Sequence, residues 1–126
     1  MKEETSKLLD KAERTILAAE TLFNAGHLEV ASGRVYYAMF YVAKALLSEK
    51  GQSSFRKHSA VHSAFGKTFT VSGLLQPKFH RWLLDAFDKR LKGDYDVDLQ
   101  ISAEDISMTL SQAREFLAEA SWYLSQ

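Results

Sequence analysis

The run KRLKGDYDVD, residues 89–98, carries the side chains of this chain that could most readily do chemistry. Arg90 is followed five positions later by Tyr95, and a guanidinium group can hold two phosphate oxygens at once. Carboxylates follow at alternate positions, as Asp94, Asp96 and Asp98. Carboxylates with this spacing can bind a divalent cation. The residue types therefore allow three interpretations: a catalytic site, a metal-binding loop, or the polar end of a helix.

The metal interpretation of the three aspartates is disfavoured by the residues that follow them. A calcium loop that opens with D-x-D-x-D has Gly at its sixth position and Glu at its twelfth, whereas this chain has Leu99 and Asp105 there. A nucleotidyltransferase holds magnesium on spaced aspartates of a strand, with a Gly-Ser phosphate loop upstream, and the sequence predicts neither. We therefore expect a solvated acidic loop, without a metal ion or a bound cofactor.

A second pair of candidates is His58 and His62, which stand four residues apart in the run HSAVH. This spacing puts both imidazoles on one face of a helix, as in metal-binding pairs. The run has no intervening Glu, and no third ligand lies nearby in the sequence. We therefore expect surface or core histidines rather than a metal site. The sequence also contains no P-loop, no G-x-G-x-x-G and no G-x-S-x-G turn.

Length and composition are those of one globular domain, residues 1–126, with 46% hydrophobic and 25% charged residues. The absence of cysteine excludes disulfides and thiolate-bound zinc. The longest uninterrupted apolar run, residues 35–43, is too short to span a bilayer, and the N-terminus is charged and has no apolar signal core. These features predict a cytoplasmic protein without membrane association.

Charge is distributed unevenly along the chain, although the net charge is zero. Residues 51–93 carry eight Lys or Arg and two acidic residues, whereas residues 94–126 carry one Arg and seven acidic residues. The basic segment could form an anion-binding face. Alternatively, the two segments pack side by side and neutralise each other. The sequence leaves both interpretations open.

Apolar residues recur with helical spacing along the whole chain, and no segment shows sustained period-two alternation. The first helix is expected to stop at Gly26 and the second at Gly51. Residues 28–50 are apolar on all sides, which is typical of a helix buried in the core or against a partner chain. A shorter helix is expected from His58 to about Thr70.

Two further helices complete the pattern. Pro77 suits the first turn of one of them, and Gly93 weakens or ends it. Ser102 with Asp105 three residues later resembles the capping box of the last helix. The fold class is therefore all-α: an antiparallel four-helix up-and-down bundle with an additional short helix.

Three runs occur in an order and spacing that resemble one known family. They are SGRVYYAMFYVAKALLSEKG at 32–51, KHSAVHSAFGKTF at 57–69 and RLKGDYD at 90–96. Together they resemble the second helix, the third helix and the Arg-x-x-(Ala/Gly)-Asp-Tyr-Asp signature of HEPN-domain proteins of the small, stand-alone prokaryotic type. The resemblance covers nearly the whole chain.

The resemblance implies a helical bundle that forms a homodimer through the faces carrying Arg90. It implies association with RNA or nucleotides, and pairing with a minimal nucleotidyltransferase in a toxin–antitoxin system. Many members of the family are metal-independent endoribonucleases that use Arg, four to six residues, then His. The arginine would stabilise the charge on the phosphorane, and the histidine would transfer protons at neutral pH.

This chain departs from that motif because Tyr95 stands where the histidine is expected. A phenol with its ordinary pKa of about 10 is a poor base at neutral pH. Arg90 and Tyr95 lie about 140° apart around a straight helix, so they share a site only if the helix unwinds at Gly93 or a second chain supplies the other wall. His58 is the substitute base if the fold brings it near Arg90, and Asp94 is placed for an i,i+4 ion pair with Arg90.

The resemblance also implies that some toxins of the family are silenced by nucleotidylation of a tyrosine, and the corresponding position here is Val97. That acceptor is therefore absent from this chain unless Tyr95 itself serves. Three functions stay open: binding of RNA or a nucleotide beside a nucleotidyltransferase partner, endoribonuclease activity based on Arg90, and a non-catalytic dimeric scaffold. The expected catalytic residues are Arg90, Tyr95 and His58, and the expected binding residues are Lys57, Asp94, Asp96, Tyr37 and Arg34.

Overall fold

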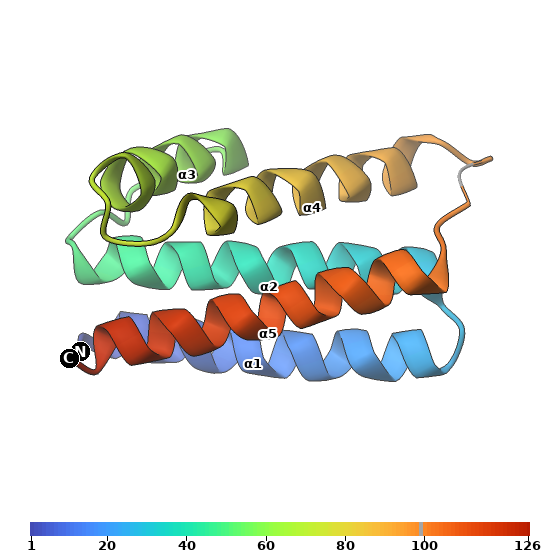
Figure 1. The fold of residues 1–126 in the computed structure, drawn as a ribbon, viewed down its shortest axis with the longest axis horizontal. Coiled ribbons are helices and arrows are strands. Elements are labelled where there is room, and N and C mark those ends of the chain that lie inside the picture. The colour runs from blue at the N-terminus through green and yellow to red at the C-terminus, as the bar shows by residue number, and fades with distance from the viewer. Residues whose placement is uncertain (99) are drawn as a thin grey trace.

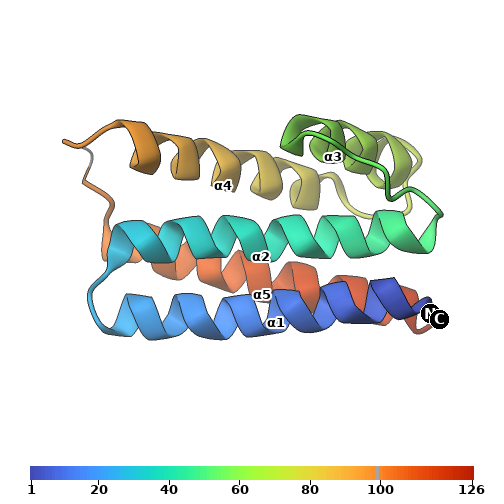
Figure 2. The same ribbon diagram turned by 180° about the vertical axis from the view of Figure 1, so that it is seen from behind.

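The computed structural model describes residues 1–98 and 100–126, and in this part of the chain every regular element is a helix. Four long helices run alternately up and down, so the predicted antiparallel bundle is confirmed (Figures 1 and 2). The elements are α1 (Glu3–Asn24), α2 (Leu28–Glu49), α3 (His58–Phe65), the π-helical segment η1 (Gly66–Val71), α4 (Pro77–Tyr95) and α5 (Ala103–Leu124). The short additional helix is α3, which lies beside the first half of α4.

The predicted ends of several helices are confirmed. Gly26 and Gly51 follow α1 and α2 with φ of +85° and +79°, a conformation that glycine adopts without steric cost. Pro77 opens α4, where its missing N–H would have no partner in any case. Each of these residues marks the end or the beginning of a helix. The turn at Gly26 lets α2 pack antiparallel to α1.

The start of α5 also joins it to α4. The Asp105 N–H donates to Ser102 Oγ at 3.1 Å, which confirms the N-cap. The carboxylate of Asp105 pairs with Lys89 of α4 at 2.9 Å instead of closing the capping box. Lys78 and Glu115 form a second ion pair between the two helices. The basic and acidic segments therefore neutralise each other in part by packing side by side.

Two glycines lie within continuous helical segments. α4 continues through Gly93 to Tyr95, so of the two predicted alternatives the helix does not end at that glycine. A Cβ at Gly93 would lie 3.4 Å from Cγ of Glu29, which is ordinary van der Waals contact, so the packing of α4 on the start of α2 leaves room for a larger residue there. The predicted helix from His58 is α-helical only as far as Phe65, and Gly66 begins the π-helical turn, where a Cβ would lie 2.6 Å from the His80 ring.

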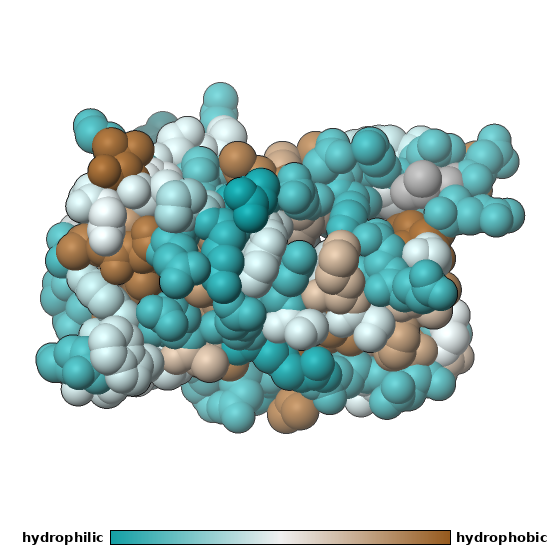
Figure 3. Space-filling model, in the orientation of Figure 1, coloured by the Kyte–Doolittle hydropathy of each residue, from teal (hydrophilic) through white to brown (hydrophobic). Residues whose placement is uncertain are grey.

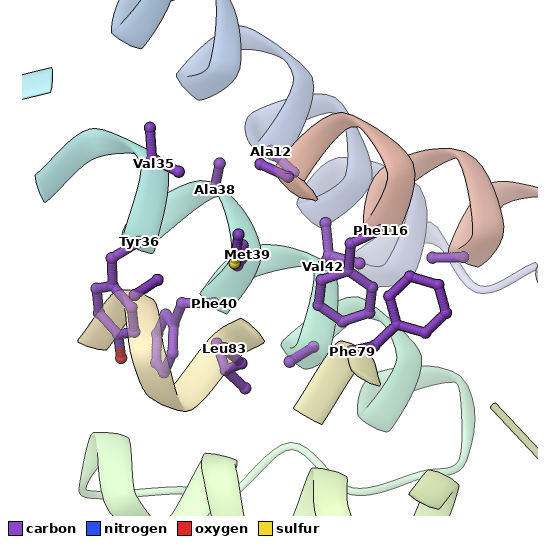
Figure 4. Packing of buried hydrophobic residues seen from close by; sticks show 14 of the residues in the cluster. Ala12, Val35, Tyr36, Ala38, Met39, Phe40, Val42, Phe79, Leu83 and Phe116 are labelled. Carbon is purple, nitrogen blue, oxygen red and sulfur yellow. The ribbon is translucent and has the colours of Figure 1, made fainter. Parts of the chain in front are cut away.

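α2 lies in the middle of the bundle, with α1 and α4 on opposite sides of it in both views (Figures 1 and 2). Its buried residues contribute to one apolar cluster with α1, α4 and α5, which confirms the prediction of a helix that is buried on most sides (Figure 4). Burial of each large side chain stabilises the fold by about 1.5–3 kcal/mol. Phe79 of α4 stacks on Phe116 of α5 at 5.2 Å between ring centroids.

The surface of one face of the molecule is mostly hydrophilic, with small separate apolar areas (Figure 3). In the described residues, none of the helices is long and apolar enough to cross a membrane. The packing of α3 and α4 against α2 is the feature of this fold that positions the candidate site.

Candidate functional site

Two consecutive tyrosines of α2 form the floor of the candidate site. Neighbouring residues on a helix point about 100° apart, so Tyr36 is fully buried while Tyr37 lies at the rim. The guanidinium carbon of Arg90, on α4, lies 5.1 Å from the Tyr37 ring centroid and 6.0 Å from that of Tyr36. This cation–π contact fixes the arginine against α2.

A second arginine faces the same rim. Arg34 lies on α2 with its guanidinium carbon 4.8 Å from the centroid of the Tyr37 ring, so two cations contact one aromatic ring. A hollow with a volume of about 620 Å³ opens beside them. It is lined by Glu29, Val30, Gly33, Arg34, Tyr37, Arg90, Gly93 and Asp94. Two guanidinium groups at one hollow are suited to binding phosphate.

Arg90 also forms the predicted ion pair with Asp94, with 3.3 Å between Nε and Oδ2. The pair is partly exposed, and such i,i+4 pairs contribute about 0.3–0.5 kcal/mol. Exchange of this carboxylate for a ligand phosphate therefore costs little. The remaining donors of the guanidinium can approach an anion in the hollow.

A buried hydrogen-bonded cluster joins α2 to α3 behind the arginine. The Tyr36 hydroxyl oxygen lies 2.8 Å from Nδ1 of His58 and 2.8 Å from Nε2 of His62. His62 is buried and His58 is half-buried. The His58 ring stacks on Phe40 at 4.3 Å between centroids. Tyr36 and Phe40 project from the same side of α2 (Figure 4).

This environment keeps all three polar groups of the cluster uncharged at neutral pH. Burial raises the pKa of Tyr36, and the neighbouring Tyr37 raises it further, while Arg90 opposes this. Burial lowers the pKa of His62 to about 4, with smaller contributions from His58 and His80. Burial lowers the pKa of His58 as well, and the positive charges of Arg90 and Lys44 add to this effect.

The structure brings two of the three expected catalytic residues together. His58 and Arg90 both contact the Tyr36–Tyr37 pair, since the His58 ring lies 5.7 Å from the Tyr37 ring. His58, the expected substitute base, and Arg90 therefore lie against the same two aromatic rings. Tyr95 lies apart from them at the end of α4, with 83% of its surface exposed.

The expected binding residues divide in the same way. Arg34, Tyr37 and Asp94 line the hollow with Arg90, whereas Lys57 and Asp96 are exposed at helix ends. Asp96 accepts a hydrogen bond from the Asp98 N–H at 3.1 Å, which is a local turn contact. Among the residues that the structure describes, no group of three potential ligands could hold a metal ion.

The sequence interpretation missed Tyr36 as a site residue and His62 as its partner. The four-residue spacing of HSAVH did show that both histidines share a helix face. Nothing in the sequence showed that a tyrosine 22 positions before His58 would lie between their rings.

Comparison with known proteins finds a family and several relatives. The HEPN domain family model matches residues 5–121. "Putative toxin MJ0142" of Methanocaldococcus jannaschii is 35% identical over 123 residues, which cover 98% of this chain and 83% of that protein. "UPF0332 protein glr0978" of Gloeobacter violaceus is 35% identical over the full length of both chains. A UPF0332 protein of Thermotoga maritima is 33% identical over 85% of this chain and 80% of its own length.

Proposed function

The chain belongs to the HEPN domain family, and on that premise we propose that it is a toxin-like endoribonuclease that cleaves RNA without a metal ion. The toxin-like role is supported by the name of its relative from Methanocaldococcus jannaschii, "Putative toxin MJ0142". We place its action in the cytoplasm, where RNA is available. The reaction is assigned to residues of α3 and α4 that meet over α2.

One observation carries this proposal: His58 and Arg90 contact the same pair of tyrosine rings. Arg90 suits the phosphate because its planar fork can bind two oxygens and it stays protonated. His58 suits proton transfer because a neutral imidazole takes a proton and then returns it. Its lowered pKa favours the neutral, basic form at pH 7.

The chemistry follows from these roles. His58 removes the proton from the ribose 2′-hydroxyl, whose oxygen attacks the adjacent phosphorus. Arg90 stabilises the additional negative charge of the phosphorane. The bond to the 5′-oxygen then breaks, and the products are a 2′,3′-cyclic phosphate and a 5′-hydroxyl. His58 returns the proton that it has taken to the leaving 5′-oxygen. We propose a homodimer as the active form.

The test is RNA cleavage by the purified protein in EDTA, followed by analysis of the ends. We expect 2′,3′-cyclic phosphates from the wild type, and a large loss of cleavage in Arg90→Ala. Arg81→Ala is the matched control, because Arg81 is an exposed arginine of the same helix. If the wild type leaves RNA intact, the nuclease proposal fails.

A second candidate function is binding of RNA or a nucleotide without cleavage, in a pair with a minimal nucleotidyltransferase. The exposure of Tyr95 favours it, because a partner enzyme could reach this hydroxyl at the end of α4. Salt-sensitive RNA binding without cleavage would support this function. Nucleotidylation would add mass to the wild type after co-expression with such a partner, and Tyr95→Phe would abolish the added mass.

A further inference from the structure

The Tyr36 hydroxyl lies between two imidazole nitrogens, each at 2.8 Å. A hydroxyl group carries one proton, so it can donate to only one of these nitrogens. If it accepted an N–H from both, the proton of this buried hydroxyl would lose its partner, which costs free energy, so it donates to one nitrogen and accepts an N–H from the other. The tautomers of the two imidazoles are therefore coupled through the Tyr36 hydroxyl. A proton placed on one ring determines the direction of both hydrogen bonds.

The two possible directions have different consequences for His58. If Tyr36 donates to Nδ1 of His58, the neutral ring carries its proton on Nε2 and cannot accept another there. If Nδ1–H of His58 donates to Tyr36, the Tyr36 hydroxyl donates to Nε2 of His62. Nε2 of His58 then has a free lone pair, and it makes no hydrogen bond to any residue that the structure describes.

We propose that Tyr36 and His62 are positioning residues that hold His58 in the tautomer with a free Nε2. This inference rests on the proposed ribonuclease function and extends it to two residues that need not touch the substrate. The arrangement follows the logic of a catalytic triad, in which a third group orients the base. Here a neutral phenol and a neutral imidazole replace the usual carboxylate.

The same hydrogen bonds serve throughout the reaction. Nε2 of His58 takes the 2′-hydroxyl proton as the bond from the 2′-oxygen to phosphorus forms. The imidazolium keeps its Nδ1–H on Tyr36, whose own proton stays on His62. Nε2 then gives its proton to a leaving 5′-oxygen as the phosphorus–oxygen bond breaks, and the neutral ring returns. No hydrogen bond of the cluster has to reverse.

The surroundings of the cluster meet the condition that this assignment places on His62. His62 must stay neutral to accept from Tyr36, and its pKa of about 4 meets that condition at pH 7. The titratable or charged groups around it are Tyr36, His58 and His80. His80 of α4 donates from Nε2 to the backbone carbonyl of His62 at 3.1 Å, which fixes α3 in place. Those around His58 are Tyr36, Tyr37 and His62, with the cations Arg90 and Lys44.

Kinetics of variants test the positioning role. Tyr36→Phe keeps the ring and removes the hydroxyl, so we expect kcat for metal-free RNA cleavage to fall roughly 10- to 100-fold with little change in KM. His62→Leu should act similarly, and His62→Gln should restore part of the rate because its amide oxygen can accept from Tyr36. Tyr41→Phe, on the same helix and outside the cluster, is the matched control.

Nitrogen-15 NMR of the histidines tests the tautomers without any need for activity. At pH 7 we expect both His58 and His62 to carry their proton on Nδ1, and His58 to lose this preference in Tyr36→Phe. A neutral His58 with its proton on Nε2, or a His62 protonated on Nε2, would overturn the inference.

Failure of the inference and failure of the proposed function give different results. If the wild type does not cleave RNA, the proposed function fails, and the spectra still decide the direction of the hydrogen bonds. If the wild type cleaves and Tyr36→Phe has the same kcat and the same pH profile, the nuclease function stands and the positioning role is wrong.

Discussion

Two regions of the described structure carry side chains that could take part in catalysis, and they differ in how firmly packing holds those side chains. The Tyr36–His58–His62 cluster is packed between α2, α3 and α4, and the Tyr36 hydroxyl joins its two histidines by hydrogen bonds. The end of α4 and the turn that follows it, residues 94–98, are exposed, and Tyr95 there has 83% of its surface in solvent. The exposed region looks more like a site in the sequence, but only the buried cluster holds its groups in a fixed geometry. Support by packing, rather than density of charge, distinguishes the better candidate.

Substitution of one residue from each region tests this comparison most directly. His58→Gln should lower the rate of metal-free RNA cleavage by roughly 10²–10⁴-fold, because general acid–base catalysis contributes on that order. Tyr95→Phe should leave the rate within about twofold. Initial rates at saturating RNA in EDTA measure both. If Tyr95→Phe lost activity while His58→Gln kept it, the catalytic site would instead lie at the exposed end of α4, where two chains of a dimer would form it together.

The buried cluster should also make stability depend on pH. His62 has a folded pKa of about 4, below the unfolded value of about 6.5. Its contribution is therefore complete above pH 6.5 and is lost as the pH falls toward 4, because only the unfolded chain takes up the proton. The loss is about 3 kcal/mol. Urea unfolding between pH 4 and 7.5 measures it.

His62→Gln is the control for this pH dependence, since the amide does not titrate. The slope of unfolding free energy against pH between 4 and 6.5 should become shallower in that variant. An unchanged slope would show that other groups cause the pH dependence. The lowered pKa of His58 acts in the same direction, so part of the dependence of unfolding free energy on pH should remain in His62→Gln.

Substitution of two glycines should change the stability of the fold by smaller amounts, in opposite directions. Gly66→Ala puts a methyl group against the His80 ring, 2.6 Å from Cε1, and should destabilise the fold by about 1–3 kcal/mol. Gly93→Ala meets only the flexible Glu29 side chain at 3.4 Å and should stabilise the helix by about 0.5–1 kcal/mol. Chemical denaturation of both variants measures whether each substitution raises or lowers the unfolding free energy. A stabilising Gly66→Ala would mean that His80 can move without cost.

The smallest expected effect lies in the exposed region. Asp94→Asn removes the ion pair with Arg90, which is worth about 0.3–0.5 kcal/mol. It also removes a negative charge from the last turn of α4, where the helix dipole disfavours it by a similar amount. The unfolding free energy should therefore change by less than about 0.5 kcal/mol. A loss above about 1 kcal/mol would show that the turn is more tightly held than its exposure indicates.

Much of the fold could be predicted because its signals are local. The glycines after α1 and α2, Pro77 at the start of α4 and the cap at Ser102 act within a few residues. For Gly93 the sequence left open whether it weakens or ends the helix, because its helix propensity is local, whereas the packing of α4 beside Glu29 is not. The π-helical turn at Gly66 was missed for the same reason, since the His80 ring that packs against it comes from another helix.

The sequence by itself determined the helices, their order, the apolar α2 at the centre, and the identity of Arg90 and His58 as candidates. Helical periodicity and end signals depend on neighbours along the chain, so they can be read without the fold. Only the tertiary structure decided that His58 and Arg90 contact the same tyrosine rings, that Tyr36 bridges two histidines, and that Tyr95 is exposed to solvent. Hydrogen bonds between distant residues and the pKa shifts caused by burial arise when helices pack, and no local pattern contains them.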